Sequence, residues 1–289
     1  MPTIVIAGGG IAGLEALVAL REDLGPDTQI ELLEPATEFV ERQRSVAEPF
    51  GGAAPRRFDL TRIAADHDAH LRPDALDSVD AKRRRVRTVR GDEIAYDALL
   101  VAVGARPDVA IPGALTFAGG RAVGAFSRLL DDLDEGRVER VAFALPTATT
   151  WPVPLYELAL MTADRARRRE GALVVVTPER APLEAFGTRI ASHVGKLLTE
   201  RRVAVCTETV PVRTGAGGLL VRGGETVQAE RVVALPRLGG PFVGGLPHDK
   251  HGFLPTDEHG AVEGVAGVWA AGDGTTFPIK QGGLAAQQA

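Results

Sequence analysis

Three glycines near the amino terminus have the spacing of a turn that binds a diphosphate. Gly8, Gly10 and Gly13 lie in the run "TIVIAGGGIAGLEALVAL", where a β-branched segment passes directly into an amphipathic one. In a GxGxxG turn the first glycine permits the tight bend, the second lets the backbone approach a pyrophosphate, and the third lets the next helix pack on the strand. The amino-terminal end of that helix favours negative charge. We therefore expect this turn to bind the pyrophosphate of a dinucleotide.

An acidic residue follows at the spacing of a ribose contact. Glu34 ends the strand-like run "QIELLEP" and lies 21 residues beyond Gly13. In a nucleotide-binding βαβ unit, an acidic residue about 20 residues further on accepts hydrogen bonds from ribose hydroxyls. The alternative is an ordinary glycine turn followed by a surface glutamate. The predicted contacts of this first site are Gly8, Gly10, Ile11, Ala12, Gly13, Glu34 and Pro35.

More than one kind of dinucleotide binds to a GxGxxG turn followed by an acidic residue. Two later segments of the chain distinguish between them. They are "YDALLVAVGARP" at residues 96–107 and "GVAGVWAAGDGTTFPIKQGGLAAQQA" at residues 264–289. Together with the glycine turn they resemble the two-dinucleotide-binding-domain flavoproteins, the pyridine nucleotide-disulphide oxidoreductase superfamily. The resemblance implies non-covalent FAD in the first site, with Asp273 on a ribityl hydroxyl. The additional contacts that it implies are Ala102, Gly104, Gly272 and Asp273.

The resemblance also places the last residues of the sequence beside the flavin ring. A helix opening at "QGGLAAQQA" would direct its first N–H groups at the pyrimidine edge of the flavin, through Gln281 and Gly282. Lys280 would add a full positive charge. Positive potential there stabilises the negative charge gained on reduction. Lys280 is therefore expected to tune the flavin, and an exposed surface lysine is the alternative.

A second βαβ pattern occupies residues 119–240, but its phosphate loop has lost its glycines. The expected strand at 140–145 runs into "LPTATTWPVP", followed by a helix at 153–168 and a strand that ends at Glu179. Prolines lack the N–H that donates to phosphate, and residues with a Cβ hinder close approach. We expect Trp151 to pack as a plug and NAD(P)H to bind weakly or not at all. Threonine hydroxyls in the loop and the Glu179 carboxylate keep weak nucleotide binding open as the alternative.

These patterns predict an α/β fold, a doubly wound Rossmann-like architecture with one domain inserted in another. The FAD-binding domain is expected to be discontinuous, at residues 1–115 and 241–289, around an NAD(P)-binding-like domain at 116–240. The nearest resemblance is to sulfide:quinone oxidoreductases and type II NADH dehydrogenases. Those relatives continue into a C-terminal domain that this sequence is expected to lack, either as a piece of a longer protein or as a naturally short one.

The cysteine count limits the chemistry that the resemblance allows. The chain has one cysteine, Cys206, inside the strand-like run "RRVAVCTE". Sulfide and disulfide chemistry in these relatives uses redox cysteines beside the flavin. The prediction is an FAD-dependent oxidoreductase that passes electrons from an unidentified donor to an acceptor such as a quinone. The alternatives are an NAD(P)H dehydrogenase and a non-catalytic flavin-binding or electron-transfer module.

Composition and charge exclude other classes of function. A net charge of −5 and a pI near 5.8 argue against a nucleic-acid-binding protein. The apolar runs are too short for a spanning helix and no leader pattern precedes the first strand, which predicts a cytoplasmic protein, peripheral at a membrane if a C-terminal region anchors it. No metal site is predicted, because the pair His248 and His251 lacks a third ligand. The expected partners are small-molecule electron donors and acceptors, with a homodimer as the candidate assembly.

Overall fold

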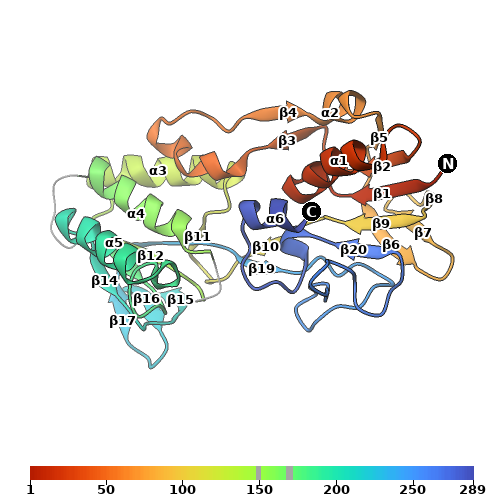
Figure 1. Cartoon of the computed structure of the whole chain (residues 1–289). Helices are drawn as coiled ribbons and strands as arrows, with labels where there is room; N and C mark the ends of the chain where they lie inside the picture. Colours follow the sequence, from red (N-terminus) through yellow and green to blue (C-terminus); the bar gives the residue numbers. More distant parts are fainter. Residues whose placement is uncertain (148–150, 167–171) are drawn as a thin grey trace. The chain divides into compact units, whose positions relative to one another are not determined.

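The computed structural model describes residues 1–147, 151–166 and 172–289 and divides into two compact units. The first unit contains Met1–Val40, Arg57–Arg106 and Leu238–Ala289. The second contains Glu41–Arg56 and Pro107–Arg237. Each unit is built around a five-stranded parallel sheet, and Figure 1 labels their elements. The predicted doubly wound α/β fold is confirmed.

The sheet of the first unit has the strand order of a dinucleotide-binding fold. Its strands are β1 (Thr3–Ala7), β2 (Gln29–Leu33), β5 (Ala69–Arg72), β9 (Ala98–Val101) and β20 (Val268–Ala270). They pair in the order β20-β9-β1-β2-β5, all parallel. The chain moves outward from β1 in one direction through β2 and β5, and in the other through β9 and β20. The strand order therefore reverses between β1 and β9, where ligands bind in open α/β sheets.

Alternating side chains of β1 cover the two faces of this sheet. Ile4 and Ile6 pack with Leu17 of α1 (Ile11–Leu24), whereas Val5 and Ala7 belong to a second apolar cluster. That cluster includes residues of the antiparallel sheet formed by β6 (Leu76–Asp80), β7 (Arg85–Thr88) and β8 (Glu93–Ala95). Burial of β1 on both faces explains its continuous run of apolar residues. The other elements of this unit are the β3 (Glu38–Val40) and β4 (Arg57–Asp59) pair, α2 (Leu60–Asp66), the short 3₁₀ helix η5 (Gly272–Gly274) and α6 (Gly282–Gln288).

The second unit repeats the plan of the first. Its parallel sheet has the order β11-β18-β12-β13-β14, from β11 (Leu115–Thr116), β12 (Val141–Ala144), β13 (Leu173–Val176), β14 (Ala204–Cys206) and β18 (Arg231–Ala234). The α-helices are α3 (Val123–Asp134), α4 (Val153–Arg165) and α5 (Thr188–Glu200). An antiparallel sheet of β15 (Pro211–Gly215), β16 (Gly218–Val221) and β17 (Thr226–Gln228) completes it. Within the described part of the chain, every helix is too short or too polar to cross a bilayer.

The limits of the units differ from the sequence expectation. Residues 41–56 and 107–115 were expected in the first unit but group with the second, and residues 238–240 group with the first. The reason for the first difference is apolar packing, because Phe50 lies 5.8 Å from Phe126 of α3 between ring centroids. Val46 joins the same buried cluster. Short strands β10 (Arg106–Asp108) and β19 (Arg237–Gly239) pair in the segments that link the units.

Candidate functional site

The predicted cofactor residues follow the carboxyl ends of four neighbouring strands in the first unit. The glycine turn follows β1, Glu34 follows β2, Ala102 and Gly104 follow β9, and Gly272 with Asp273 follows β20. Parallel strands end at the same edge of a sheet, so the fold brings these four turns together. Figure 1 shows β9, β1 and β2 running side by side in this sheet. The edge is also the one that contains the reversal of strand order.

The three glycines of the first turn have two kinds of surroundings. Gly8 has a φ of +115°, and a Cβ on it would lie 2.3 Å from the carbonyl oxygen of Ala102. A Cβ on Gly13 would lie 1.8 Å from the carbonyl oxygen of Gly8. Around the Cβ position of Gly10, by contrast, no heavy atom lies within 4 Å. Two glycines therefore permit close packing of the chain on itself, while the third leaves open space of the kind that a pyrophosphate needs.

The Glu34 carboxylate is hydrogen-bonded to the backbone of the glycine turn. One carboxylate oxygen accepts a hydrogen bond from the Gly9 N–H at 2.7 Å, and the other accepts from the Ala36 N–H at 2.9 Å. Each carboxylate oxygen has a further lone pair, so ribose hydroxyls can still donate to it. Pro35 is exposed beside it. These two hydrogen bonds orient the Glu34 carboxylate and leave it able to accept further hydrogen bonds.

Small residues line the other side of the site. The buried residues Ala12, Ala102, Ala271 and Ala285 form one cluster from α1, the residues that follow β9 and β20, and α6, with Ile11 partly buried against it. Gly272 has a φ of +78° and donates its N–H to the side-chain oxygen of Gln288 at 2.8 Å. Gly104, with a φ of +71°, follows β9. Because these residues are small, α6 packs directly on α1 beside the glycine turn.

Lys280 and Asp273 lie near enough in this region for each charge to affect the pKa of the other residue. Burial lowers the pKa of Lys280 to about 8, an effect that the carboxylates of Asp273 and Asp249 oppose. Burial raises the pKa of Asp273, and Lys280 opposes that shift. The Lys280 ammonium donates to the carbonyl oxygen of Thr275 and lies 4.2 Å from the centre of the Phe253 ring. Lys280 is therefore a partly buried, contacted lysine, and the exposed alternative does not describe it.

Gln281 makes a contact within α6 that the sequence did not predict. It is the N-cap of α6, and its side-chain oxygen accepts the N–H of Leu284 at 2.9 Å. The oxygen is engaged inside the chain, while the amide nitrogen keeps its two donors. Gly282 is the first residue of α6. The sequence did not indicate the contributions of Phe253 and Asp249, since neither belongs to a motif. It also did not indicate the cap made by Gln281 or the contact made by Gln288, although both residues lie in the quoted C-terminal segment.

In the second unit, the carboxylate at the ribose position is buried. Glu179 is 3% exposed, and one of its oxygens accepts hydrogen bonds from the hydroxyls of Tyr156 at 2.6 Å and Thr177 at 2.9 Å. Burial raises the pKa of Tyr156, and its hydrogen bond to Glu179 adds to that effect. The network ties α4 to the turn that follows β13. Glu179 therefore serves internal packing, which the sequence position alone does not reveal.

Trp151 contacts the end of the segment between β13 and α5. Its ring lies 5.1 Å from the ring of Phe186 between centroids, in an edge-to-face arrangement. Residues 148–150 of the loop "LPTATTWPVP" lie outside the described residues, so the expected donors Thr149 and Thr150 are not placed. The described part of the loop reaches α4 through Pro152, the N-cap residue. The Trp151–Phe186 contact agrees with a packed side chain at this position.

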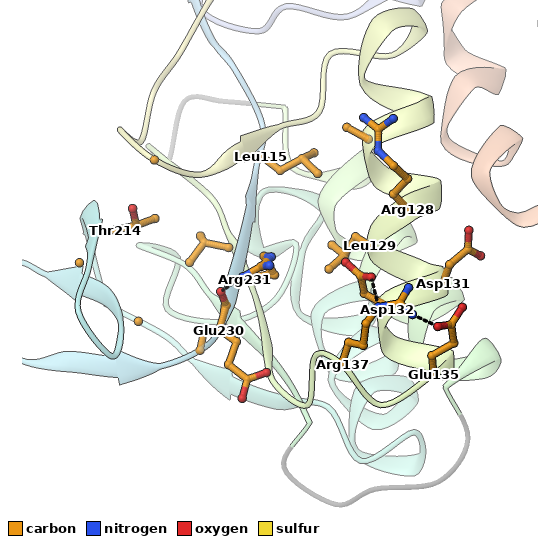
Figure 2. Close-up of a pocket in the computed structure, with 16 residues that line it drawn as sticks. Leu115, Arg128, Leu129, Asp131, Asp132, Glu135, Arg137, Thr214, Glu230 and Arg231 are labelled. Carbon is orange, nitrogen blue, oxygen red and sulfur yellow. Dashed lines mark hydrogen bonds and ion pairs between the residues drawn. The ribbon is translucent and has the colours of Figure 1, made fainter.

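A cavity of about 720 Å³ lies elsewhere in the second unit, among α3, β11, β18 and the β15–β16 hairpin (Figure 2). Figure 2 shows Arg137 directed at two acidic side chains, with Asp132 paired at 2.7 Å and Glu135 in contact. Asp131 pairs with Arg165 at 3.1 Å. None of the predicted cofactor residues lines this cavity. It is therefore separate from the site at the glycine turn.

The fold and this site define a class of protein, and comparison with known proteins agrees. The chain belongs to the pyridine nucleotide-disulphide oxidoreductase family, whose sequence pattern matches residues 2–289. The expected family is confirmed, and with it FAD as the cofactor and flavin-dependent oxidoreductases as the class.

Solved structures extend this likeness over the whole chain. The structure is similar to the sulfide:quinone oxidoreductase from the bacterium Aquifex aeolicus, with a TM-score of 0.88 and 20% identity, over 100% of this chain and 74% of that one. It is also similar to a NAD-dependent persulfide reductase from A. fulgidus, with a TM-score of 0.73 and 20% identity, over 100% of this chain and 57% of that one. At this level of identity, both likenesses concern the fold.

Among curated proteins, apoptosis-inducing factor 3 of Mus musculus is 27% identical over 212 residues. The match covers 70% of this chain and 33% of that protein. The chain therefore spans about a third of the length of the curated relative that it matches.

Proposed function

We propose that the first unit binds one FAD without a covalent bond and that the chain passes electrons from a donor to an acceptor such as a quinone. The observation that carries this proposal is the glycine turn after β1, where Gly8 and Gly13 are packed and Gly10 faces open space. The other proposed contacts are Ile11, Ala12, Glu34, Pro35, Ala102, Gly104, Gly272, Asp273, Lys280, Gln281 and Gly282. In this proposal the second unit is the degenerate NAD(P)-binding-like domain.

The protein residues bind, orient and adjust the charge around the cofactor. When bound, FAD supplies the electron-carrying chemistry, which no side chain in the chain needs to provide. The amino-terminal end of α1 favours the pyrophosphate, and the Glu34 carboxylate accepts from the ribose. Lys280 adds positive charge close to Asp273. That charge favours the reduced form of the cofactor over the oxidised form.

The donor is proposed not to require a cysteine. Cys206, the one cysteine of the chain, lies on β14 of the second unit, partly buried against an apolar cluster. A redox pair of cysteines therefore has no counterpart in this sequence. The relative from Aquifex aeolicus is a sulfide:quinone oxidoreductase, which supports a quinone as the class of acceptor proposed for this chain.

An anaerobic screen of flavin bleaching tests the proposal. FAD-loaded protein is mixed in turn with NADH, NADPH, sulfide and dithionite, and then with a soluble quinone or oxygen. Rapid bleaching by a donor other than dithionite, NADH or NADPH, followed by reoxidation with the quinone, is the result expected of the proposed oxidoreductase. Bleaching by dithionite alone would leave the other candidate, a flavin-binding or electron-transfer module.

The same screen decides the NAD(P)H alternative. The proposal expects slow or absent bleaching by NADH and NADPH, because the second loop holds prolines and the Glu179 carboxylate is engaged by Tyr156 and Thr177. Saturable bleaching at sub-millimolar NADH or NADPH would instead identify an NAD(P)H dehydrogenase. The persulfide reductase from A. fulgidus is NAD-dependent, so the two nucleotides belong in the screen.

A further inference from the structure

The Lys280 ammonium is held by a loop that none of the cofactor motifs includes. Its nitrogen lies 4.2 Å from the centre of the Phe253 ring and donates to the carbonyl oxygen of Thr275. The carboxylates of Asp273 and Asp249 both favour the protonated form of Lys280. Phe253 and Asp249 come from a segment about 30 residues earlier in the sequence. The position of the Lys280 ammonium thus depends in part on Phe253 and Asp249, which lie outside the flavin motifs.

The loop that carries Phe253 has a defined shape. One oxygen of Asp249 accepts the N–H groups of His251 at 2.8 Å and of Phe253 at 2.9 Å. Gly252 between them has a φ of +87°, which favours glycine. Phe253 itself is partly buried. These bonds fix the backbone of Phe253, and its ring lies under the Lys280 ammonium.

We propose that Phe253 is a positioning residue for Lys280, holding its charge where it acts on the bound flavin. The inference rests on the proposed FAD site. A cation over an aromatic face is attracted by the negative face of the ring, and the attraction increases where water is partly excluded. An aliphatic residue of similar bulk fills the space but provides no such face. Without the ring, the ammonium is free to turn toward solvent, and its effect on the flavin weakens.

The midpoint potential of the bound flavin is the main measurement. It is compared at neutral pH in wild type, Phe253→Leu, Phe253→Tyr, Lys280→Met and the double variant Phe253→Leu/Lys280→Met. We expect a negative shift in Phe253→Leu that is smaller than or equal to the shift in Lys280→Met. Phe253→Tyr keeps the ring and the wild-type potential. The double variant matches Lys280→Met, because Phe253 acts only through Lys280.

A matched control separates this effect from a general loss of aromatic packing. Phe277 is 41% exposed in the segment before Lys280, and it makes no ring contact with another described residue. Phe277→Leu should therefore leave the potential unchanged. An unchanged potential in Phe253→Leu while Lys280→Met is shifted, or additive shifts in the double variant, would overturn the positioning role of Phe253.

A readout in the FAD-free protein keeps failure of this inference distinct from failure of the proposed function. The side-chain NH₃⁺ signal of Lys280 in ¹⁵N NMR, assigned by its loss in Lys280→Met, reports a held ammonium. It should persist in Phe253→Tyr and broaden in Phe253→Leu, or in Phe253→Met if the leucine variant does not fold. An equally sharp signal in the leucine or methionine variant contradicts the inference whether or not FAD binds. A wild-type chain that stays colourless with excess FAD contradicts the proposed function instead.

Discussion

A Cβ on Gly13 would lie 1.8 Å from the carbonyl oxygen of Gly8, so α1 packs on the turn after β1 at a distance that only glycine allows. Gly13→Ala should therefore destabilise the FAD-free protein. Alanine is favoured over glycine in a helix by about 1 kcal/mol, but forcing a methyl group against backbone costs about 1–3 kcal/mol or more. Because the contact at 1.8 Å is with backbone, the cost should be about 3 kcal/mol, so we expect a net loss of about 2 kcal/mol in the free energy of unfolding, measured with urea.

Gly10→Ala is the matched comparison within the same turn. No heavy atom lies within 4 Å of its Cβ position, and its φ is −82°, a value that alanine adopts. The FAD-free variant should lose no more than about 1 kcal/mol, because the N-cap position slightly disfavours alanine. Equal and large losses in both variants would show that Gly10 is packed in the same way as Gly13.

Tyr156 and Tyr96 provide a second matched pair. The Tyr156 hydroxyl donates to Glu179 at 2.6 Å in the interior of the second unit. Removing it in Tyr156→Phe leaves a buried carboxylate short of a donor, so the free energy of unfolding should fall by about 1.5–3 kcal/mol. Thermal or urea unfolding measures this loss.

Tyr96→Phe should have the opposite sign. The Tyr96 hydroxyl is buried and has no hydrogen-bond partner among the described residues. Deleting a buried, unpaired polar group removes a desolvation cost, so the variant should be unchanged or more stable by up to about 1 kcal/mol. A large loss of stability in Tyr96→Phe would mean that its hydroxyl has a partner.

Lys280 should give the FAD-free protein a stability that rises at alkaline pH. Its folded pKa is lowered to about 8, below the value of about 10.4 in an unfolded chain. Between these values the unfolded chain binds more protons, so folding becomes more favourable as the pH rises. The free energy of unfolding of wild type, minus that of Lys280→Met, should increase between about pH 8 and pH 10. A flat or falling difference would place Lys280 in solvent.

The parts of the fold with strong local patterns were predictable from the sequence. The β-branched run ending at Ala7, the glycine turn and the helix after it appear as expected, because each depends on residues close in sequence. Glu34 lies at the end of β2 at the expected distance from Gly13. The role of Gly13 was predictable for the same reason, because it packs on Gly8, five residues earlier. The functional assignment of each site residue stays a prediction.

Long-range contacts account for what the sequence did not indicate. The hydrogen bond of Tyr156 to Glu179 joins residues 23 positions apart, and Tyr156 belongs to no motif. The contact of Lys280 with Phe253 depends on a loop whose shape is fixed by Asp249. Residues 41–56 pack on α3 through Phe50, so the unit limits follow apolar contacts that cross the expected boundary. Such contacts form only after the chain has folded.

FAD binding to Gly10→Asp tests the central claim most directly. Gly10 is the N-cap of α1, where aspartate stabilises a helix, but a carboxylate there would repel a pyrophosphate. We therefore predict a FAD-free variant at least as stable as wild type whose FAD affinity, from quenching of flavin fluorescence, falls by tenfold or more. Gly124→Asp, in the first turn of α3 with no heavy atom within 4 Å of its Cβ position, is the control and should bind like wild type. Wild-type affinity in Gly10→Asp, or no FAD binding by the wild-type chain, would contradict the account.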